Sequence, residues 1–162
     1  SSDVCSSDLG ARRSRKPIWV LSSAQAGDSM CLHDKHDLAR ALATERAAQE
    51  AYRQAGLGPG DVDVVELHDC FTIAELLEYE AMGLTPRGQG ARAVLDGWTH
   101  RDGRLPVNPS GGLKAKGHPI GATGCILTVK ALYELQRTQA RRALVSMCIG
   151  GGQGIAAVFE RL

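Results

Sequence analysis

Residues 142–160, RALVSMCIGGGQGIAAVFE, contain two apolar runs separated by a glycine-rich turn. Residues 142–147 and 155–160 each have the length and composition of a buried strand. We expect the first run to form a strand that ends at Cys148, and the second to form the last strand of the domain. Two adjacent strands therefore close a sequence whose earlier part alternates between strands and helices.

Working back from this pair, residues 18–22 and 62–67 also have the character of buried strands, and residues 25–36 are polar and predict a loop. Helices are expected at three places, namely from Asp37 to Ala55 with Leu38 in its apolar stripe, from Ile73 to Met82, and from Pro119 to Leu135. The pattern predicts an α/β layered domain, with a mixed sheet and helices packed on it.

Residues 85–112 are rich in Gly and Pro and show little periodicity. A connection of this length is uncommon in a compact domain. We therefore expect this stretch to be functional or to pack over another part of the protein.

Composition sets limits on the class of protein. A chain of 162 residues can bury the core of one domain, and 43% hydrophobic with only 4% aromatic residues predicts a core of Ala, Val, Leu and Ile. The formal net charge of +1 indicates neither a nucleic-acid partner nor an anionic membrane surface. No secretory signal and no apolar run of transmembrane length is present in the sequence.

The five cysteines are irregularly spaced and include no C-x-x-C pair, so neither a disulfide framework nor a zinc site is expected. Residues 31–36 gather Cys31, His33, Asp34 and His36, but their spacing fits no zinc pattern. Reduced thiols favour a reducing compartment, and we expect a cytoplasmic protein without a resident metal or cofactor.

Residues 1–9, SSDVCSSDL, repeat Ser-Ser-Asp without helical or strand periodicity and resemble translated sequencing adapter. We expect residues 1–16 to be a disordered or artefactual leader and residues 17–162 to be the folded domain. On this interpretation the native chain begins further upstream.

Three motifs carry the candidate chemistry, namely HDCF at 68–71, NPSGGLKAKGHPIGATG at 108–124 and CIGGG at 148–152. Thiols and imidazoles among glycines suit acyl transfer, because they move protons while glycine backbones approach a developing oxyanion. The first and last motifs follow predicted strands, and ligands bind at the carboxyl ends of strands in open α/β sheets.

His118 is the strongest single candidate. Pro119 disfavours a helical backbone at His118, so the imidazole stands just before a helix begins. The helix N-terminus favours a neutral imidazole that donates a hydrogen bond, and it would stabilise a neighbouring thiolate.

Cys148 is held at the end of a strand, next to glycines that let backbone amides point into a cleft. His68 and Cys70 share one side of the chain if strand geometry persists, so His68 can orient a water or carbonyl and Cys70 can be a second acid or base. Other polar residues are expected to have no catalytic role. Cys125 is expected in the core, and Glu75, Glu78 and Glu80 are expected on a solvated helix face.

In this order the motifs resemble the C-terminal half of a thiolase, the family that makes or cleaves the carbon–carbon bond of 3-ketoacyl-CoA, over roughly residues 18–162. The resemblance implies that Cys148 is the acid/base thiol and that His118 assists the nucleophilic cysteine and donates to the thioester oxygen. It also implies that Gly150 offers an N–H to a second oxyanion hole. Coenzyme A would be a substrate.

The first motif differs from that of the commoner thiolases, which have Asn-Glu-Ala-Phe where this chain has HDCF at 68–71. Together with VNPSGG at 107–112, it resembles the sterol-carrier-protein type, in which the first-motif cysteine can be the acid/base. Both Cys70 and Cys148 are present here, and we favour Cys148. His68 would take the role of Asn in polarising a water.

Thiolases carry the nucleophile in an N-terminal half-domain, which is missing from this chain, so we expect the chain alone to be inactive. The resemblance implies acyl-CoA and CoA as ligands, a homodimer or tetramer when complete, and in related lyases a small accessory protein. Three hypotheses stay open: an acyltransferase, a retro-aldol lyase on CoA thioesters, and a non-catalytic lipid or acyl-CoA binding module. Cys148 favours the first over the third.

Overall fold

The computed structural model describes residues 17–162, so the predicted leader at 1–16 lies outside the described residues. A four-stranded sheet has the order β1-β4-β3-β2, formed by β1 (Ile18–Gly27), β2 (Val64–Glu66), β3 (Arg142–Gly150) and β4 (Gln153–Arg161). β4 runs antiparallel to both β1 and β3, whereas β2 is parallel to β3. The predicted mixed sheet and the closing strand pair are confirmed.

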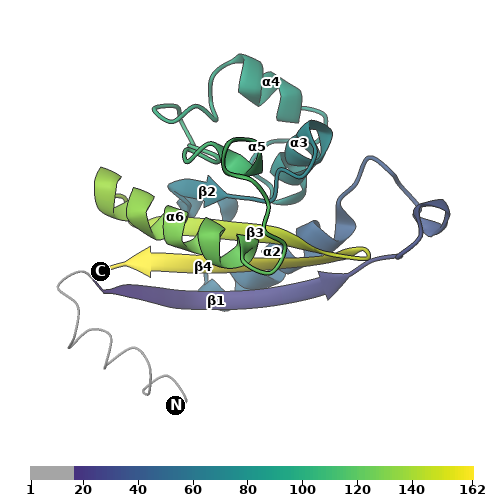
Figure 1. Ribbon diagram of the computed structural model, residues 1–162, viewed down its shortest axis with the longest axis horizontal. Coiled ribbons are helices and arrows are strands. Elements are labelled where there is room, and N and C mark those ends of the chain that lie inside the picture. Colours follow the sequence, from purple (N-terminus) through teal and green to yellow (C-terminus); the bar gives the residue numbers. More distant parts are fainter. Residues whose placement is uncertain (1–16) are drawn as a thin grey trace, which may run out of the picture.

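The sheet is covered on both faces, by α2 (Leu42–Ala55) on one and α6 (Thr123–Thr138) on the other (Figure 1). Alternate residues of β3 point to opposite faces, so Leu144 packs with the α2 cluster and Ala143 with the α6 cluster. The result is a three-layer α/β/α domain with two separate apolar cores.

Alanines let α2 lie close against the sheet. Ala47, Ala48 and Ala51 lie on the side of α2 that faces the sheet, and they are fully buried. A Cβ atom at Gly154 on β4 would lie 2.9 Å from the Thr44 backbone nitrogen, so only glycine fits there. The helix ends where Gly56 takes a left-handed conformation with φ of 65°, as the sequence predicts.

Five shorter elements complete the description, namely η1 (Leu32–Asp34), η2 (Pro59–Asp61), α3 (Thr72–Ala81), α4 (Gly90–Leu95) and α5 (Gly112–Lys116). The predicted helix at 73–82 is confirmed as α3, and Gly83 follows it with φ of 71°. α4 and α5 were not expected. α4 packs against α3, so the long stretch at 85–112 does cover another part of the protein.

Three predicted boundaries are wrong by four residues or more. β1 continues through Gly27 because it pairs with β4 along its whole length. α2 begins at Leu42 instead of Asp37, since Asp37 pairs with Arg87 and leaves Leu38 exposed. α6 begins only at Thr123, whose backbone N–H donates to the carbonyl of Pro119.

Candidate active site

The three motifs meet at one edge of the sheet, where β2 and β3 end. The parallel register places Glu66, the last residue of β2, opposite Val145, so the residues that follow β2 run beside the last residues of β3, which include Cys148. α6 starts at the same edge, because a Cβ atom at Gly124 would lie 3.4 Å from the sulfur of Met147 on β3. All of the predicted site residues therefore lie on segments that reach this edge.

Two imidazoles from different motifs are in direct contact. His68 Nε2 lies 3.2 Å from His118 Nε2, and the ring centroids are 4.7 Å apart. On its other side, His118 Nδ1 lies 2.6 Å from the hydroxyl of Thr123. The fold thus links His68, His118 and Thr123 into one hydrogen-bonded chain.

Burial keeps the histidine pair from carrying two charges. His68 is only 6% exposed, and this burial is the main reason that its pKa is lowered from the ordinary value. The His118 imidazole lowers the pKa of His68 further, and Asp69 opposes the shift. His68 is therefore held neutral at physiological pH.

The two thiols of the site are both half-buried, and Cys148 is close enough to affect Cys70. Burial raises the pKa of the Cys70 thiol, and the Glu78 carboxylate and Cys148 raise it further. Cys70 consequently stays a neutral thiol at pH 7. Cys148 lies on β3 opposite Gly154 and just before an irregularity in the β3–β4 ladder.

Gly150 follows that irregularity with φ of 93°, a conformation that favours glycine. A Cβ atom built at Gly150 would meet nothing within 4 Å, so its surroundings are open. Space beside its backbone is what a substrate oxygen would need. A role for its N–H in an oxyanion hole stays a prediction.

The first part of the long motif fixes the HDCF loop in place. The Asp69 carboxylate accepts a hydrogen bond of 2.7 Å from the Leu113 N–H, and it occupies the space where a Cβ atom of Gly112 would be. Lys114 Nζ donates to the Cys70 carbonyl at 2.7 Å. The loop that carries His68 and Cys70 is therefore held in place by residues of the motif at 108–124.

A second set of contacts connects the end of β2 to the motif at 108–124. Asn108 Oδ1 accepts from the Leu67 N–H at 2.8 Å. The Glu66 side chain is fully buried, and its carboxylate accepts from the hydroxyl of Ser110 at 3.0 Å and pairs with Lys116 at 3.3 Å. These roles of Asn108 and Ser110 could not be predicted from the sequence, because their partners lie more than 40 positions away.

The expected solvated face of α3 is wrong at Glu78, which is 4% exposed. Its Oε2 has no hydrogen-bond partner within residues 17–162. Burial raises its pKa well above the ordinary value, and the Glu75 and Asp69 carboxylates add to the rise. Burial also raises the pKa of Glu75, whose carboxylate accepts from Tyr79 at 2.7 Å. A cluster of buried acids therefore lies behind the first motif.

Large apolar side chains are exposed within the three motifs or near them. Phe71, Ile120 and Ile149 belong to the motifs, Ile73 lies at the start of α3, and Met30 and Leu32 follow β1. The loop after β1 reaches the third motif, since a Cβ atom at Gly151 would lie 3.7 Å from the Met30 side chain. Each of the three motifs therefore carries an exposed large apolar side chain.

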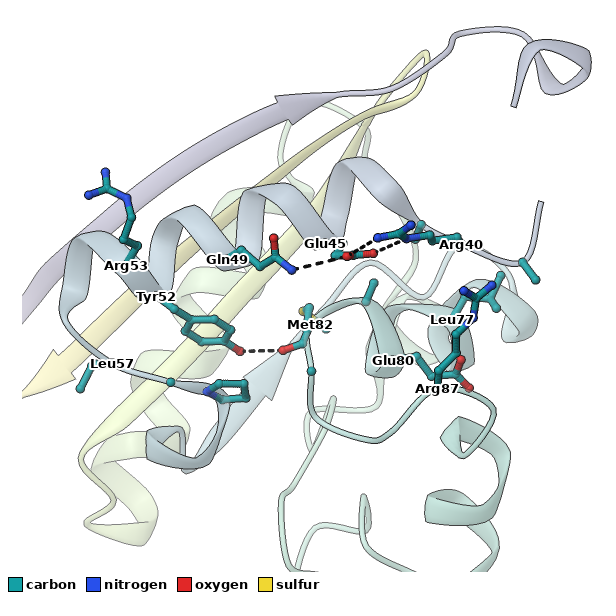
Figure 2. Close-up of a pocket in the computed structure, with 16 residues that line it drawn as sticks. Arg40, Glu45, Gln49, Tyr52, Arg53, Leu57, Leu77, Glu80, Met82 and Arg87 are labelled. Atoms are coloured by element: carbon teal, nitrogen blue, oxygen red, sulfur yellow. Dashed lines mark hydrogen bonds and ion pairs between the residues drawn. The ribbon is translucent and has the colours of Figure 1, made fainter. Parts of the chain in front are cut away.

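A groove of about 600 Å³ lies away from these motifs, between α2 and the end of α3 (Figure 2). No residue of the three motifs lines this groove. Figure 2 shows Glu45 held by Arg40 and Gln49, and the Tyr52 hydroxyl donating to the Met82 carbonyl. Other polar side chains that line the groove have partners outside it, as Arg53 has in Glu50 and Arg87 in Asp37, and the lining contains no thiol or imidazole.

Two further cysteines lie outside the site. Cys125 was expected in the core, but it is exposed on the side of α6 that faces away from the sheet. Donor atoms of Cys31, His33 and Asp34 lie within 4.8 Å of one another, and all three residues are exposed. Within residues 17–162, no helix combines the length and apolar character needed to cross a membrane.

Comparison with known proteins identifies a family. Residues 24–161 match the family model described as thiolase C-terminal domain-like. The chain is 44% identical over 161 residues to acetyl-CoA acetyltransferase of Methanothermobacter thermautotrophicus, covering 96% of this chain and 42% of that protein. It is 46% identical over 119 residues to sterol carrier protein 2 of Rattus norvegicus, covering 71% of this chain and 22% of that protein.

A solved structure described as an Ltp2-ChsH2(DUF35) aldolase has the same fold, with a TM-score of 0.74 at 23% identity. The match covers 87% of this chain and 39% of the other. In every one of these comparisons the chain spans less than half of the protein or chain that it matches.

Proposed function

Because the chain belongs to the thiolase family, we propose that it supplies the C-terminal half of an acyl-CoA C-acyltransferase that makes or cleaves the carbon–carbon bond of 3-ketoacyl-CoA. The observation that carries this proposal is the contact of His68 with His118 at the strand-end edge that also holds Cys70 and Cys148. Acyl transfer needs proton-moving groups gathered around a reacting carbonyl, and this edge gathers them.

In the direction of bond formation, the Cys148 thiolate would take a proton from the carbon next to the thioester of an acyl-CoA. The carbanion would attack the carbonyl of an acyl group held on a cysteine outside this chain, and the bond from that carbonyl to the cysteine sulfur would break. His118 would return to that sulfur the proton that it took when the cysteine was acylated, while Cys148 keeps the proton taken from carbon. Coenzyme A enters as part of the substrate.

Two features support Cys148 as the acid/base in preference to Cys70. Burial and the Glu78 carboxylate raise the pKa of Cys70, which disfavours the thiolate needed to take a proton. Cys148 also precedes Gly150, whose open surroundings suit the approach of a thioester. His68 would orient a water or carbonyl through its contact with His118.

The apolar side chains at the edge favour a hydrocarbon acyl group as the occupant. Phe71 is 69% exposed, and Ile149 follows Cys148 directly in the sequence. Burying apolar surface contributes about 25 cal/mol per Å², so a hydrocarbon chain laid across these residues would add to substrate affinity.

The complete site would require the nucleophile of an N-terminal half, and we propose that the chain alone is inactive. A retro-aldol lyase uses the same fold, and a nucleophilic cysteine in the other half distinguishes the acyltransferase from it. The oligomeric state, and any accessory protein, would also be properties of the complete protein.

A chimera tests the proposal. Residues 17–162 would replace the matching part of the acetyl-CoA acetyltransferase of Methanothermobacter thermautotrophicus. We expect the chimera to cleave acetoacetyl-CoA in the presence of CoA, and the chain alone to show no turnover near ordinary enzyme rates of about 1 per second or faster.

His118→Ala in the chimera is the matched control. It should raise the barrier by about 3 kcal/mol, which is typical for the loss of one transition-state donor. A folded chimera without thiolytic activity, or a chimera in which His118→Ala changes nothing, would contradict the proposal.

A further inference from the structure

Thr123 lies directly behind His118, on the side away from His68. It is 1% exposed and is the first residue of α6. Its Oγ1 is 2.6 Å from His118 Nδ1 and 3.0 Å from the carbonyl oxygen of Pro119. A hydroxyl has one proton, so only one of these two contacts can be a donation by Thr123.

The donation goes to Pro119. A threonine in a helix can donate to the carbonyl four positions earlier. The Pro119 carbonyl is at that position and can only accept, as it also does from the backbone N–H groups of Ala122 and Thr123. The contact with His118 must then run the other way, with Nδ1–H of the imidazole donating to the Thr123 oxygen. In neutral His118 this leaves Nε2 as an acceptor.

The remaining contacts agree with this direction. With His118 Nε2 as acceptor, the 3.2 Å contact requires His68 to donate through its own Nε2–H. His68 Nδ1 then carries a lone pair, and it is the buried atom that has no partner within residues 17–162. If His118 instead donated to His68 Nε2, neutral His68 would carry its proton on Nδ1. That N–H would be buried without an acceptor, which proteins avoid more strongly than an unpaired acceptor.

We propose that Thr123 is the positioning residue that holds His118 in the Nδ1–H tautomer and makes Nε2 its proton-accepting atom. For the reaction this means that neutral His118 accepts a proton before it donates one, and it becomes a donor at Nε2 only as the imidazolium. This consequence for catalysis rests on the proposed function, whereas the tautomer itself does not.

The tautomer can be measured on the 162-residue chain without any turnover. Long-range proton–nitrogen correlation spectra of the ¹⁵N-labelled chain report which nitrogen of each imidazole carries the proton. Spectra of His118→Gln and His68→Gln assign the two signals among the five histidines. We expect His118 to be protonated at Nδ1 and His68 at Nε2 at neutral pH.

Three variants distinguish the effect of the Thr123 hydroxyl on the His118 tautomer from the effect of side-chain packing. Thr123→Val keeps the shape but removes the oxygen, and it should change the tautomer ratio of His118 by about fivefold or more. Thr123→Ser should restore the wild-type ratio. Thr128→Val removes an equivalent hydroxyl, which donates to the Gly124 carbonyl at 2.9 Å one turn along α6, and should leave His118 unchanged.

The result that would overturn the proposal is an Nε2–H tautomer of His118 in the wild-type chain, or an unchanged ratio in Thr123→Val. Far-UV circular dichroism confirms that each variant is folded, and if Thr123→Val does not fold, the wild-type and Thr123→Ser spectra still decide the tautomer. In the active chimera, Thr123→Val should lower kcat by about tenfold or more with little change in KM, as expected for loss of an orienting partner. An inactive chimera would contradict the proposed function and leave the tautomer measurement standing.

Discussion

The groove beside α2 and the strand-end edge differ in how their polar groups are used. In the groove, the charged side chains form pairs with one another, as Arg40 does with Glu45. At the edge, Cys70 and Cys148 are half-buried and His68 is buried, and the pKa values of Cys70 and His68 are shifted by burial and by neighbours from other segments. The groove of about 600 Å³ therefore lacks the thiols and imidazoles that the edge brings together.

The strongest way to sharpen this contrast is to remove the two thiols separately in the chimera. Cys148→Ala should lower turnover by about 10²-fold or more, the usual scale for losing a proton-transfer group, and Cys70→Ala should cost much less. Steady-state thiolysis of acetoacetyl-CoA measures both. A severe effect of Cys70→Ala beside a mild one of Cys148→Ala would reverse the assignment.

The edge also depends on close backbone packing, which Gly112→Ala would break. Gly112 has φ of 62°, and a Cβ atom there would collide with the Asp69 carboxylate. Strain and displacement together should lower the free energy of unfolding by about 3 kcal/mol or more, measured by urea denaturation.

Gly60→Ala is the control for that substitution, because a Cβ atom at Gly60 meets nothing within 4 Å. It should change the free energy of unfolding by about 0.5 kcal/mol or less. Equal losses in the two variants would mean that the Asp69 loop is not held by its contact with Gly112.

The buried acid behind the edge gives a pH-dependent prediction. The pKa of Glu78 is raised in the folded state, so its contribution to stability is present below the ordinary value of 4.5 and is lost as pH rises through the folded value. Within that window the wild-type chain should lose up to about 1.4 kcal/mol of unfolding free energy per pH unit from this group.

Glu78→Gln cannot ionise at this position, so its stability should fall less steeply with pH in the same window. Urea denaturation from pH 4 to pH 9 compares the two chains. Parallel pH profiles would show that Glu78 titrates as it does in the unfolded chain.

Substitutions in the groove should have the smallest effects. Tyr52→Phe removes the hydrogen bond of 3.2 Å to the Met82 carbonyl and should cost about 1 kcal/mol of stability. Arg40→Ala breaks a surface pair and should cost about 1 kcal/mol or less. Neither should change kcat of the chimera, and a loss of turnover in either variant would mean that the groove is coupled to the edge.

Local sequence patterns were sufficient for most of the fold. The apolar runs at 142–147 and 155–160 predicted β3 and β4, and the strand ends correctly placed His68 and Cys148 at one edge. These features are readable because they depend on residues that are close in the sequence. The comparisons confirm the family, whereas the roles of the site residues stay predictions.

What could not be predicted depends on distant partners. Glu78 was expected in solvent because α3 alone is amphipathic, but α3 packs against both α2 and α4. Cys125 was expected in the core because thiols are often buried, yet the sheet-facing stripe of α6 runs through Leu127 and Ala131 instead. Thr123 was quoted within a motif, and only the three-dimensional structure gives its hydroxyl two partners.

The parallel pairing of β2 with β3 has a consequence for how the molecule folds. It joins Val64 to Ala143, across all of the segment that contains α3 to α6. Closing so long a loop is slow relative to forming a local hairpin such as β3–β4. During synthesis, His68 and Cys70 would leave the ribosome long before the strand that completes their surroundings, so this edge of the sheet is incomplete and exposed to solvent in that interval.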